Sequence, residues 1–288
     1  MKPKLILLAL LSAFSLQPST LVHAASTIDA ANKYAYAANL GWMDVRGDVA
    51  NGAVVGEYVC SGYLYSANVG WINLGSGSPA NGIQYQNGSA GDFGVNQDGL
   101  GNLRGYAWGA NIGWINFEAT GAPKVDLLTG SLSGYAYSAN CGWISLSNAM
   151  AYVQTDTIAP DADTDHNGLS DAWELQKFGH IGVDPNADPD HDGRSNLQEY
   201  LADTNPNDSN DYLGITNFTR DATGYNLVAW KSVPTRFYYI QRTTVLADPD
   251  HPFMDTYIYW GPGWHSTGFY DLDDTVFYRI RAFRPLTP

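Results

Sequence analysis

Residues 62–74 read GYLYSANVGWINL, and the same pattern occurs four times in the first half of the 288-residue chain. The other copies are YAYAANLGWMDV at 34–45, GYAWGANIGWINF at 105–117 and GYAYSANCGWISL at 134–146. Their tryptophans, Trp42, Trp71, Trp114 and Trp143, are separated by 29, 43 and 29 residues. This spacing indicates a duplicated unit of two repeats.

Each copy predicts a β-hairpin, because an alternating strand leads through Ala-Asn-x-Gly to a second strand that begins with Trp. On the first strand an aromatic pair lies on one face, and Ala35, Leu64, Ala107 or Ala136 lies on the other. Both faces are largely apolar. We therefore expect a mainly β, multidomain protein whose N-terminal domain is sandwich-like, since two-sided burial suits layered sheets. A propeller is less favoured, because blades usually need about 40 residues.

The repeated aromatic residues have two interpretations. Rings at one strand position in every copy are typical of a repeating core, which is the interpretation we favour. Flat rings also stack on sugars, so a glycan-binding face stays open. Exposure of Tyr63, Tyr65, Tyr106 and Trp108 separates the two, because a core would bury these rings.

The composition excludes several classes of protein. The chain has 29 acids and 15 bases, for a net charge of −14, yet 44% of its residues are hydrophobic and 13% aromatic. It is too apolar for a disordered acidic tail. Its negative charge disfavours nucleic acid and anionic membrane surfaces and favours cations as partners.

The first 24 residues predict a signal peptide. Lys2 and Lys4 precede an apolar run from Leu5 to Leu16, and Val22-His23-Ala24 fits the site of cleavage. The run is too short for a membrane-spanning helix, which needs roughly 20 apolar residues. We expect a secreted, extracellular or cell-surface protein, with a periplasmic location open and no transmembrane segment in the mature chain. In such compartments disulfides persist, so Cys60 and Cys141 either pair or are buried thiols.

A segment from Asp156 to Asp211 holds fourteen acids and two bases, which account for twelve of the fourteen net negative charges. Two twelve-residue windows inside it, DTDHNGLSDAWE and DPDHDGRSNLQE, start 25 residues apart. Both fit a calcium loop, with oxygen ligands at positions 1, 3, 5, 7, 9 and 12 and Gly at position 6. The predicted ligands are Asp163, Asp165, Asn167, the Leu169 carbonyl, Asp171 and Glu174, and then Asp188, Asp190, Asp192, the Arg194 carbonyl, Asn196 and Glu199.

Two Ca²⁺ ions are the expected cofactors. Magnesium fits less well, because a bidentate Glu at position 12 supplies a seventh oxygen. Zinc ligands are missing, since His166 and His191 occupy position 4, which points away from the ion. A short helix is expected after each loop, the first ending at Gly179. Ser170 and Ser195 at position 8 depart from an EF-hand, which has an aliphatic residue there.

Residues 161–211 resemble thrombospondin type 3 calcium repeats, through the DxDxDGxxDxxD pattern of the two windows. Glu replaces Asp at position 12 of both, and Asn196 replaces Asp at position 9 of the second. The GYAWSxNxGWI-like repeats resemble those of secreted bacterial surface proteins. The first resemblance implies a calcium-organised spacer, which we expect to be loose without calcium and rigid with it. We therefore expect four parts: a signal peptide at 1–24, a repeat domain at 25–154, a connector at 155–211 and a C-terminal β-sandwich at 212–288.

The C-terminal part, with strands expected at 226–230, 236–245, 256–260 and 276–283, resembles terminal β modules of bacterial secreted proteins through WKSVPTRFYYIQ at 230–241 and FYRIRAF at 277–283. We find no catalytic motif, so we expect a non-enzymatic protein without catalytic or organic-cofactor residues. The function expected is that of a calcium-binding structural or adhesion protein, whose partner is a cell-surface protein or glycan. A glycan-binding adhesin and an accessory part of a carbohydrate-active system stay open.

Overall fold

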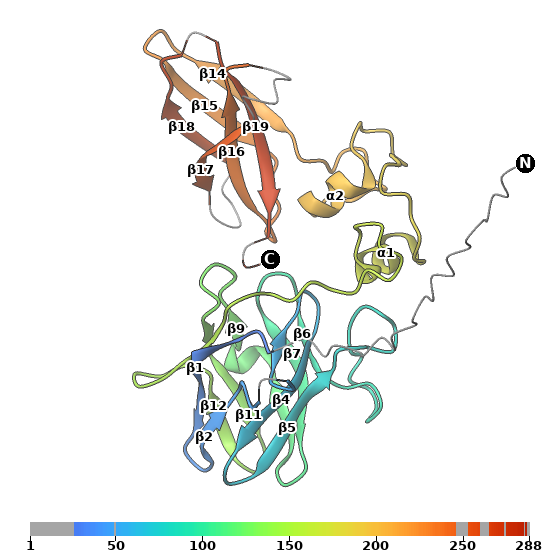
Figure 1. The fold of residues 1–288 in the computed structure, drawn as a ribbon, viewed down its shortest axis with the longest axis vertical. Coiled ribbons are helices and arrows are strands. Elements are labelled where there is room, and N and C mark those ends of the chain that lie inside the picture. Colours follow the sequence, from blue (N-terminus) through green and yellow to red (C-terminus); the bar gives the residue numbers. More distant parts are fainter. Residues whose placement is uncertain are drawn as a thin grey trace, which may run out of the picture.

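A computed structural model describes residues 26–48, 50–245, 253–259, 265–273, 275–284 and 286, and the predicted signal peptide lies outside these residues. The described chain is mainly β, as expected, with an N-terminal sheet, two short helices and a C-terminal pair of sheets (Figure 1). The main N-terminal strands are β1 (Ile28–Ala37), β2 (Gly41–Asp44), β4 (Cys60–Ser66), β5 (Gly70–Ser76), β7 (Leu103–Gly109), β8 (Gly113–Phe117), β11 (Tyr135–Ser138) and β12 (Gly142–Ser145).

These eight strands form four antiparallel hairpins, one for each sequence repeat. The last strand, β12, also pairs with β1, through Tyr36 opposite Ser145 and Ala37 opposite Ile144. The sheet therefore closes into a barrel, and the expectation of a sandwich-like N-terminal domain was wrong. Closure removes both sheet edges, which a repeating set of hairpins achieves when the last copy meets the first.

Short elements cover one end of the barrel and join the repeats. They are β3 (Val54–Val55), β6 (Val95–Gln97), the 3₁₀ helix η1 (Ala119–Gly121), β9 (Lys124–Val125), β10 (Leu132–Ser133) and β13 (Val153–Thr155). Strands β3, β6 and β13 add to the barrel sheet, whereas β9 and β10 pair with each other.

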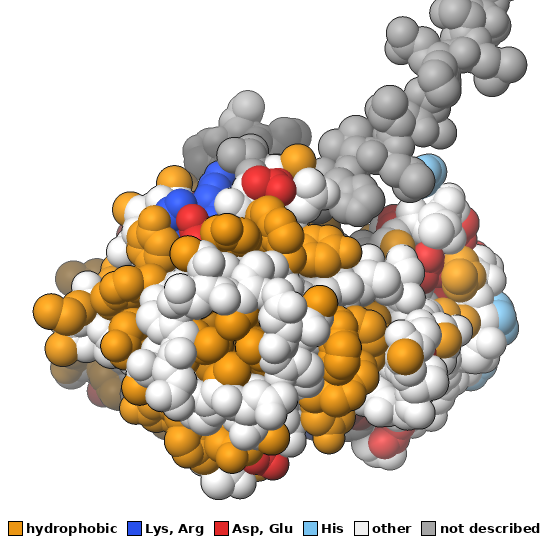
Figure 2. Space-filling view, turned by 90° about the horizontal axis from the view of Figure 1, so that it is seen from below, with side chains coloured by type: hydrophobic (Ala, Val, Ile, Leu, Met, Phe, Trp, Pro, Cys, Tyr) orange, Lys and Arg blue, Asp and Glu red, His pale blue; other side chains and the backbone are white. Residues whose placement is uncertain are grey.

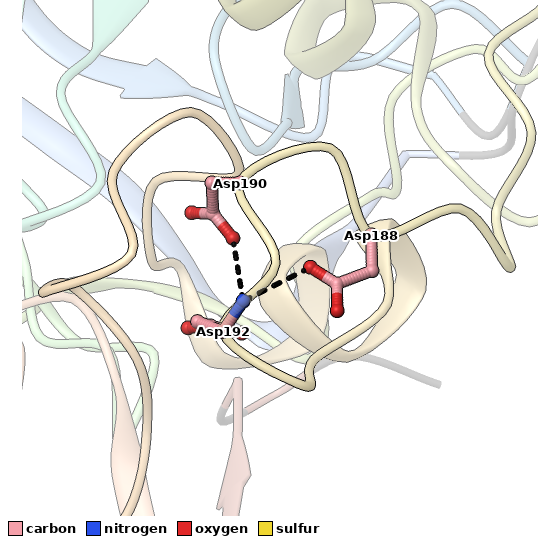
Figure 3. Close-up of side chains that lie close together, drawn as sticks. All are labelled: Asp188, Asp190 and Asp192. Carbon is pink, nitrogen blue, oxygen red and sulfur yellow. Dashed lines mark hydrogen bonds between the residues drawn. The ribbon is translucent and has the colours of Figure 1, made fainter.

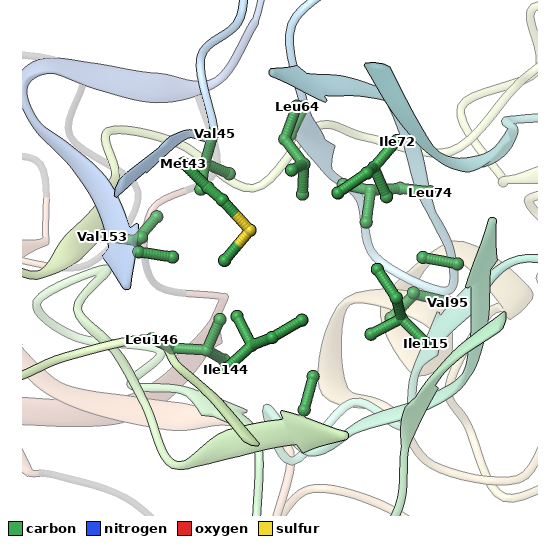
Figure 4. Packing of buried hydrophobic residues seen from close by; sticks show 14 of the residues in the cluster. Met43, Val45, Leu64, Ile72, Leu74, Val95, Ile115, Ile144, Leu146 and Val153 are labelled. Carbon is green, nitrogen blue, oxygen red and sulfur yellow. The ribbon is translucent and has the colours of Figure 1, made fainter. Parts of the chain in front are cut away.

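The barrel interior is filled mostly by small residues from the first strands of the hairpins, with Leu64 as the exception, and by larger apolar residues from the second strands (Figure 4). Ala107 and Ile72, for example, are both fully buried. The core side chains of the four hairpins leave an apolar cavity of about 40 Å³ between them. An eight-stranded barrel is just wide enough for side chains to fill it, so small residues must face larger ones across it.

The repeated aromatic rings lie on the outside of the barrel, so their assignment to the core was wrong. Tyr63 and Tyr65 are each 40% exposed, Tyr106 is 36% exposed and Trp108 is 38% exposed. The rings lie outside because the barrel interior is narrow. It accommodates alanines and aliphatic residues and leaves no room for four sets of large rings.

The Ala-Asn-x-Gly loops close the other end of the barrel. Each loop Asn donates a side-chain hydrogen bond to the carbonyl of residue x in the preceding hairpin, and Asn39 completes the ring by donating to Cys141. The four bonds measure 2.8–3.1 Å and join Asn68 to Leu40, Asn111 to Val69, Asn140 to Ile112 and Asn39 to Cys141. The x side chains pack against the core. Figure 2 views this end and shows hydrophobic atoms at its centre, a paler ring, and hydrophobic atoms again at the perimeter.

Cys60 and Cys141 are both buried free thiols. Cys141 is one of the four x residues, whereas Cys60 begins β4 at the end of that strand away from the hairpin loop. The pairing that sequence left open is therefore absent from the structure, because the two residues belong to opposite ends of the barrel.

After β13, the chain passes along β3 before it reaches the first acidic loop. Ala159 donates its backbone N–H to the Val55 carbonyl, and its own carbonyl accepts from Glu57. The segment contains α1 (Asp171–Phe178) and α2 (Asn196–Ala202), which confirms the short helices expected after the two loops. Gly179 ends α1 in the left-handed conformation, with φ of 77°.

The C-terminal part consists of two three-stranded antiparallel sheets that share a core. One contains β14 (Ile215–Arg220), β15 (Tyr225–Trp230) and β18 (Ser266–Tyr270), and the other β17 (Met254–Tyr259), β16 (Phe237–Thr243) and β19 (Phe277–Phe283). Trp230 and Ile240, from different sheets, are both buried in that core. The arrangement fits the expected small sandwich, although the sequence did not predict strands β14 and β18.

Candidate metal centre

The two acidic loops have the same backbone conformation. His166 and His191, at position 4, have φ of 60° and 62°. Gly168 and Gly193, at position 6, have φ of 90° and 88°. Both histidines are exposed, as the sequence predicted, and the left-handed turn at position 6 is one that glycine adopts without strain.

Backbone N–H groups hold the first carboxylate of each loop. In the first loop, Asp163 accepts from Asn167 N at 3.2 Å and from Gly168 N at 3.0 Å. In the second, Asp188 accepts from Asp192 N at 3.2 Å and from Gly193 N at 2.9 Å. These bonds wrap the chain of each loop around its first carboxylate.

The position-8 serines cap the helices that follow. The Ser170 hydroxyl accepts from Trp173 N, and the Ser195 hydroxyl accepts from Gln198 N in a full capping box. Each cap places the position-12 glutamate in the first turn of its helix, next to its loop. Glu174 and Glu199 are 0% and 1% exposed. Position 8 thus differs from an EF-hand because its serine caps the helix that follows the loop.

The second loop gathers its carboxylates closely. Asp188, Asp190 and Asp192 each offer an oxygen, and these atoms lie within 4.8 Å of one another (Figure 3). The Asp192 N–H donates to both other carboxylates, at 3.2 Å each. Four oxygens at this loop are buried and accept no hydrogen bond, namely Asp190 Oδ2, Asp192 Oδ2, Asn196 Oδ1 and Glu199 Oε2. Buried oxygens without donors are costly, and a metal cation could satisfy a set that consists only of acceptors.

The electrostatics of the second loop reflect this crowding. Burial, followed by the charges of Asp190 and Asp192, raises the pKa of Glu199 to about 7. Burial also raises the pKa of Asp190, and the neighbouring carboxylates of Asp192 and Asp188 add to that increase. A divalent cation would reverse both effects.

The first loop satisfies its acids internally to a greater extent. Glu174 Oε1 accepts from the Asn167 side-chain amide at 3.0 Å and from the backbone N–H groups of Gly182 and Val183 at 3.0 and 2.7 Å. Its other oxygen, Oε2, is buried without a hydrogen bond. Asp165 also accepts from the Asn167 amide, at 3.1 Å.

Position 9 makes different hydrogen bonds in the two loops, and its role as a ligand stays a prediction. One oxygen of Asp171, Oδ1, accepts from the backbone and hydroxyl of Thr164 at 2.9 and 3.2 Å. Asn196 instead donates its amide to the Asp184 carbonyl and leaves its oxygen without a donor. Leu169 and Arg194 directly precede the capping serines, and the role of their carbonyls stays a prediction.

Sequence reasoning did not find the groups that support the two glutamates. Thr204 donates its hydroxyl to Glu199 Oε1 at 3.3 Å, and Gly182 and Val183 bind Glu174 from beyond α1. These residues lie outside both twelve-residue windows, so no spacing rule marks them.

Helix α2 also joins the connector to both β parts. The buried Arg236, which precedes β16, donates to the carbonyls of Tyr200 and Leu201 at 3.1 and 2.9 Å. The guanidinium of Arg284 lies 4.7 Å from the ring of Tyr200 and forms an ion pair with Glu57 of the barrel part. The helix that carries Glu199 therefore contacts two arginines from beyond the acidic segment, and one of them, Arg284, links it to Glu57 of the barrel part.

No protein-family model, curated protein sequence or solved structure matches this chain. Among the described residues, none of the helices has the length and apolar character that crossing a membrane requires.

Proposed function

We propose that this chain is a secreted calcium-binding structural protein, in which two acidic loops make a connector rigid between two β parts. The observation that carries the proposal is the set of four buried oxygens at the second loop that no donor satisfies. The donor set is oxygen only, which is the chemistry of Ca²⁺ and does not suit zinc. Asp188, Asp190, Asp192 and Glu199 would hold the ion, with Asn196 as a neutral ligand.

The position of α2 supports a mechanical role. An ion held by both the loop and Glu199 would tie the loop to the first turn of α2. The other end of α2 presents Tyr200 and Leu201 carbonyls to Arg236. Calcium binding at one end of the helix would thereby order the contacts at its other end, because ligand binding to the folded form stabilises it.

The test is thermal unfolding and limited proteolysis of the mature chain in chelator, in Ca²⁺ and in Mg²⁺. We expect calcium at about one hundred times its Kd to stabilise the chain by about 2.7 kcal/mol. Cleavage within 155–211 should slow at the same time. We expect a Kd on the order of 10⁻⁴ to 10⁻³ M, as in other extracellular modules.

Glu199→Gln should remove most of the calcium response, because it takes a charge from the buried centre. Glu118→Gln, a half-exposed residue of the barrel part, is the matched control and should respond as the parent chain does. Equal melting and equal proteolysis in chelator and in calcium would refute the proposed function.

A further inference from the structure

The outward residues of the barrel form four equivalent rows that run across the strands. Each row starts at a Tyr, passes a short polar residue and a second ring, and ends at a Trp. The β-sheet registers define them as Tyr34–Asp44–Tyr65–Trp71, Tyr63–Asn73–Trp108–Trp114, Tyr106–Asn116–Tyr137–Trp143 and Tyr135–Ser145–Tyr36–Trp42. A row spans three gaps between strands, or about 14 Å at roughly 4.8 Å per gap.

Each terminal tryptophan lies in an open cluster with the second ring of its own row and with the first tyrosine of a neighbouring row. Trp71 is 46% exposed, and its ring centre lies 4.9 Å from that of Tyr65 with a tilt of 58°. Tyr63 meets the same indole at 6.4 Å, edge-on at 83°. The other three hairpins repeat this geometry, with terminal tryptophans 43–46% exposed. Tilted neighbours leave part of every indole open to solvent.

The barrel's own loops hold the indoles in place. A Cβ atom on Gly47 would lie 3.0 Å from the Trp71 ring, and one on Gly121 would lie 3.1 Å from the Trp143 ring. Phe93 packs edge-on against Trp114, with ring centres 5.1 Å apart. Rings already fixed in this way lose little conformational entropy when a ligand covers them.

A polar group lies between the rings of every row. Asn73 uses its side-chain oxygen to accept from Gly75 N at 2.8 Å. Its amide nitrogen donates no hydrogen bond among the described residues, so it is available to a ligand. Asp44 is the one charged residue in the four rows, and Lys33 neutralises it with an ion pair of 2.6 Å. The rows are thus nearly uncharged on a chain of net charge −14.

We infer that the four rows bind neutral carbohydrate, with the Trp and Tyr rings stacked on sugar faces and Asn73, Asn116 or Ser145 bonded to hydroxyls. A sugar ring has an apolar C–H face and a polar rim, and each row presents these two chemistries side by side. An apolar protein partner fits less well, because a polar residue interrupts each row. The lack of net charge in the rows matches a neutral ligand.

The fourfold repetition indicates a polymeric ligand. A single row contacts a short oligosaccharide, whereas several rows on one barrel can engage a repeating chain or a polysaccharide surface. Simultaneous engagement raises the apparent affinity by 10²–10⁴-fold when the geometry permits it. This inference does not rest on the calcium-binding function, because the rows and the acidic loops have no residue in common.

The test uses the mature chain on an array of neutral oligosaccharides built from glucose, mannose, galactose and N-acetylglucosamine, together with insoluble cellulose and chitin. Trp71→Ala and Trp114→Ala should each reduce the number of oligosaccharides bound per chain. The double variant should lose at least about tenfold in affinity for the polymer that binds. Tyr152→Ala, which removes a ring 39% exposed outside the rows, is the matched control and should bind normally.

A second measurement needs no variant. In the parent chain, the bound oligosaccharide should protect exposed indoles from oxidation by N-bromosuccinimide. Binding should also be equal in chelator and in calcium, whatever the outcome for the acidic loops. The inference would be overturned if no oligosaccharide bound and none protected the indoles. It would also be overturned if the double variant bound the polymer normally, or if binding disappeared in chelator. Self-association lost in the double variant would overturn it as well, by assigning the rows to a second copy of the chain.

Discussion

The side-chain amide of Asn167 lies 3.0 Å from Oε1 of Glu174 and donates a hydrogen bond to it. The equivalent residues of the second loop are Asp192 and Glu199, and there the two carboxylates repel each other. The first loop therefore carries an internal donor at the place where the second has only acceptors. Although the two loops share one backbone conformation, they differ in how far internal donors satisfy their acidic side chains.

We expect the second loop to bind calcium first and more tightly. Asp192→Asn should weaken that site roughly tenfold, because calcium affinity follows the number of charged ligands. Asn167→Asp should strengthen the first site by a similar factor, since it replaces a donor with a carboxylate. Isothermal titration calorimetry of the two variants measures both changes. Unchanged affinities in both, or tighter binding at the first loop of the parent chain, would contradict the expected order.

Stability in chelator should depend on pH through Glu199. Its pKa is about 7 in the folded chain, against about 4.3 for an unperturbed glutamate. The folded state binds this proton more tightly, so stability falls as pH rises from about 4 through 7. We expect a loss of up to about 3 kcal/mol between pH 4 and pH 8, measured by urea unfolding in chelator. Glu199→Gln should flatten this profile, and an equally steep profile in that variant would assign the effect to another group.

The acidic loops could be predicted from sequence because nearly every position has its own backbone or ligand requirement. Gly168 and Gly193 adopt left-handed φ values, and Ser170 and Ser195 cap the helices that follow. Because these requirements involve only neighbouring residues, a short stretch of sequence is enough to predict them. The support that Thr204 gives Glu199 was not predictable, because it depends on where the chain returns after α2.

The hairpins could also be predicted, but their closure into a barrel could not. An alternating strand looks the same in a sandwich and in a barrel, and both faces of these strands are apolar. The register between hairpins decides the outcome, and it is set by long-range bonds such as Asn39 to the Cys141 carbonyl. Closure then makes the interior narrow, so Ala107 lies inside and Trp108 lies outside.

The loop end of the barrel should tolerate exchanges between repeats. Cys141 occupies the place that Val69 holds in another hairpin, and Cys141 is buried. We expect Cys141→Val to change the free energy of unfolding by less than about 1 kcal/mol, because the exchange conserves apolar volume. Cys141→Asp should cost about 3 kcal/mol or more, since it buries an unpaired charge. Thermal unfolding of both variants measures this, and equal stabilities would show that the x position is not packed as described.

Asn68→Ala should destabilise the loop end of the barrel, because it removes one of the four hydrogen bonds by which the loop asparagines link neighbouring hairpins. The side-chain amide of Asn68 donates to the Leu40 carbonyl at 2.8 Å. We expect a loss of about 1 kcal/mol, typical of one intramolecular hydrogen bond. Asn207→Ala, which removes a comparable bond to the Lys177 carbonyl in the connector, is the control. Hydrogen exchange should rise in the barrel hairpins of the first variant only, and a rise confined to the connector would contradict the ring.

The contact between α2 and Arg236 should depend on calcium. The Arg236 guanidinium is buried and donates to the carbonyls of Tyr200 and Leu201. Arg236→Ala leaves both acceptors without this donor, so we expect a loss of about 3 kcal/mol in calcium. Arg236→Lys should recover only part of it, because an ammonium cannot reproduce the planar guanidinium fork. Arg281→Ala is the matched control and should cost less than about 1 kcal/mol, since Arg281 is 58% exposed and pairs with Asp255 at 4.0 Å.

Combining Arg236→Ala with Glu199→Gln tests whether calcium acts through α2. If the ion orders the helix that Arg236 binds, the loss caused by Arg236→Ala should shrink in the Glu199→Gln background and in chelator. A double-mutant cycle by urea unfolding measures this coupling, which should exceed about 0.5 kcal/mol for residues joined through one short helix. Additive losses in calcium would show that the metal loop and the junction are independent, and the connector would then be stiffened at its loops alone.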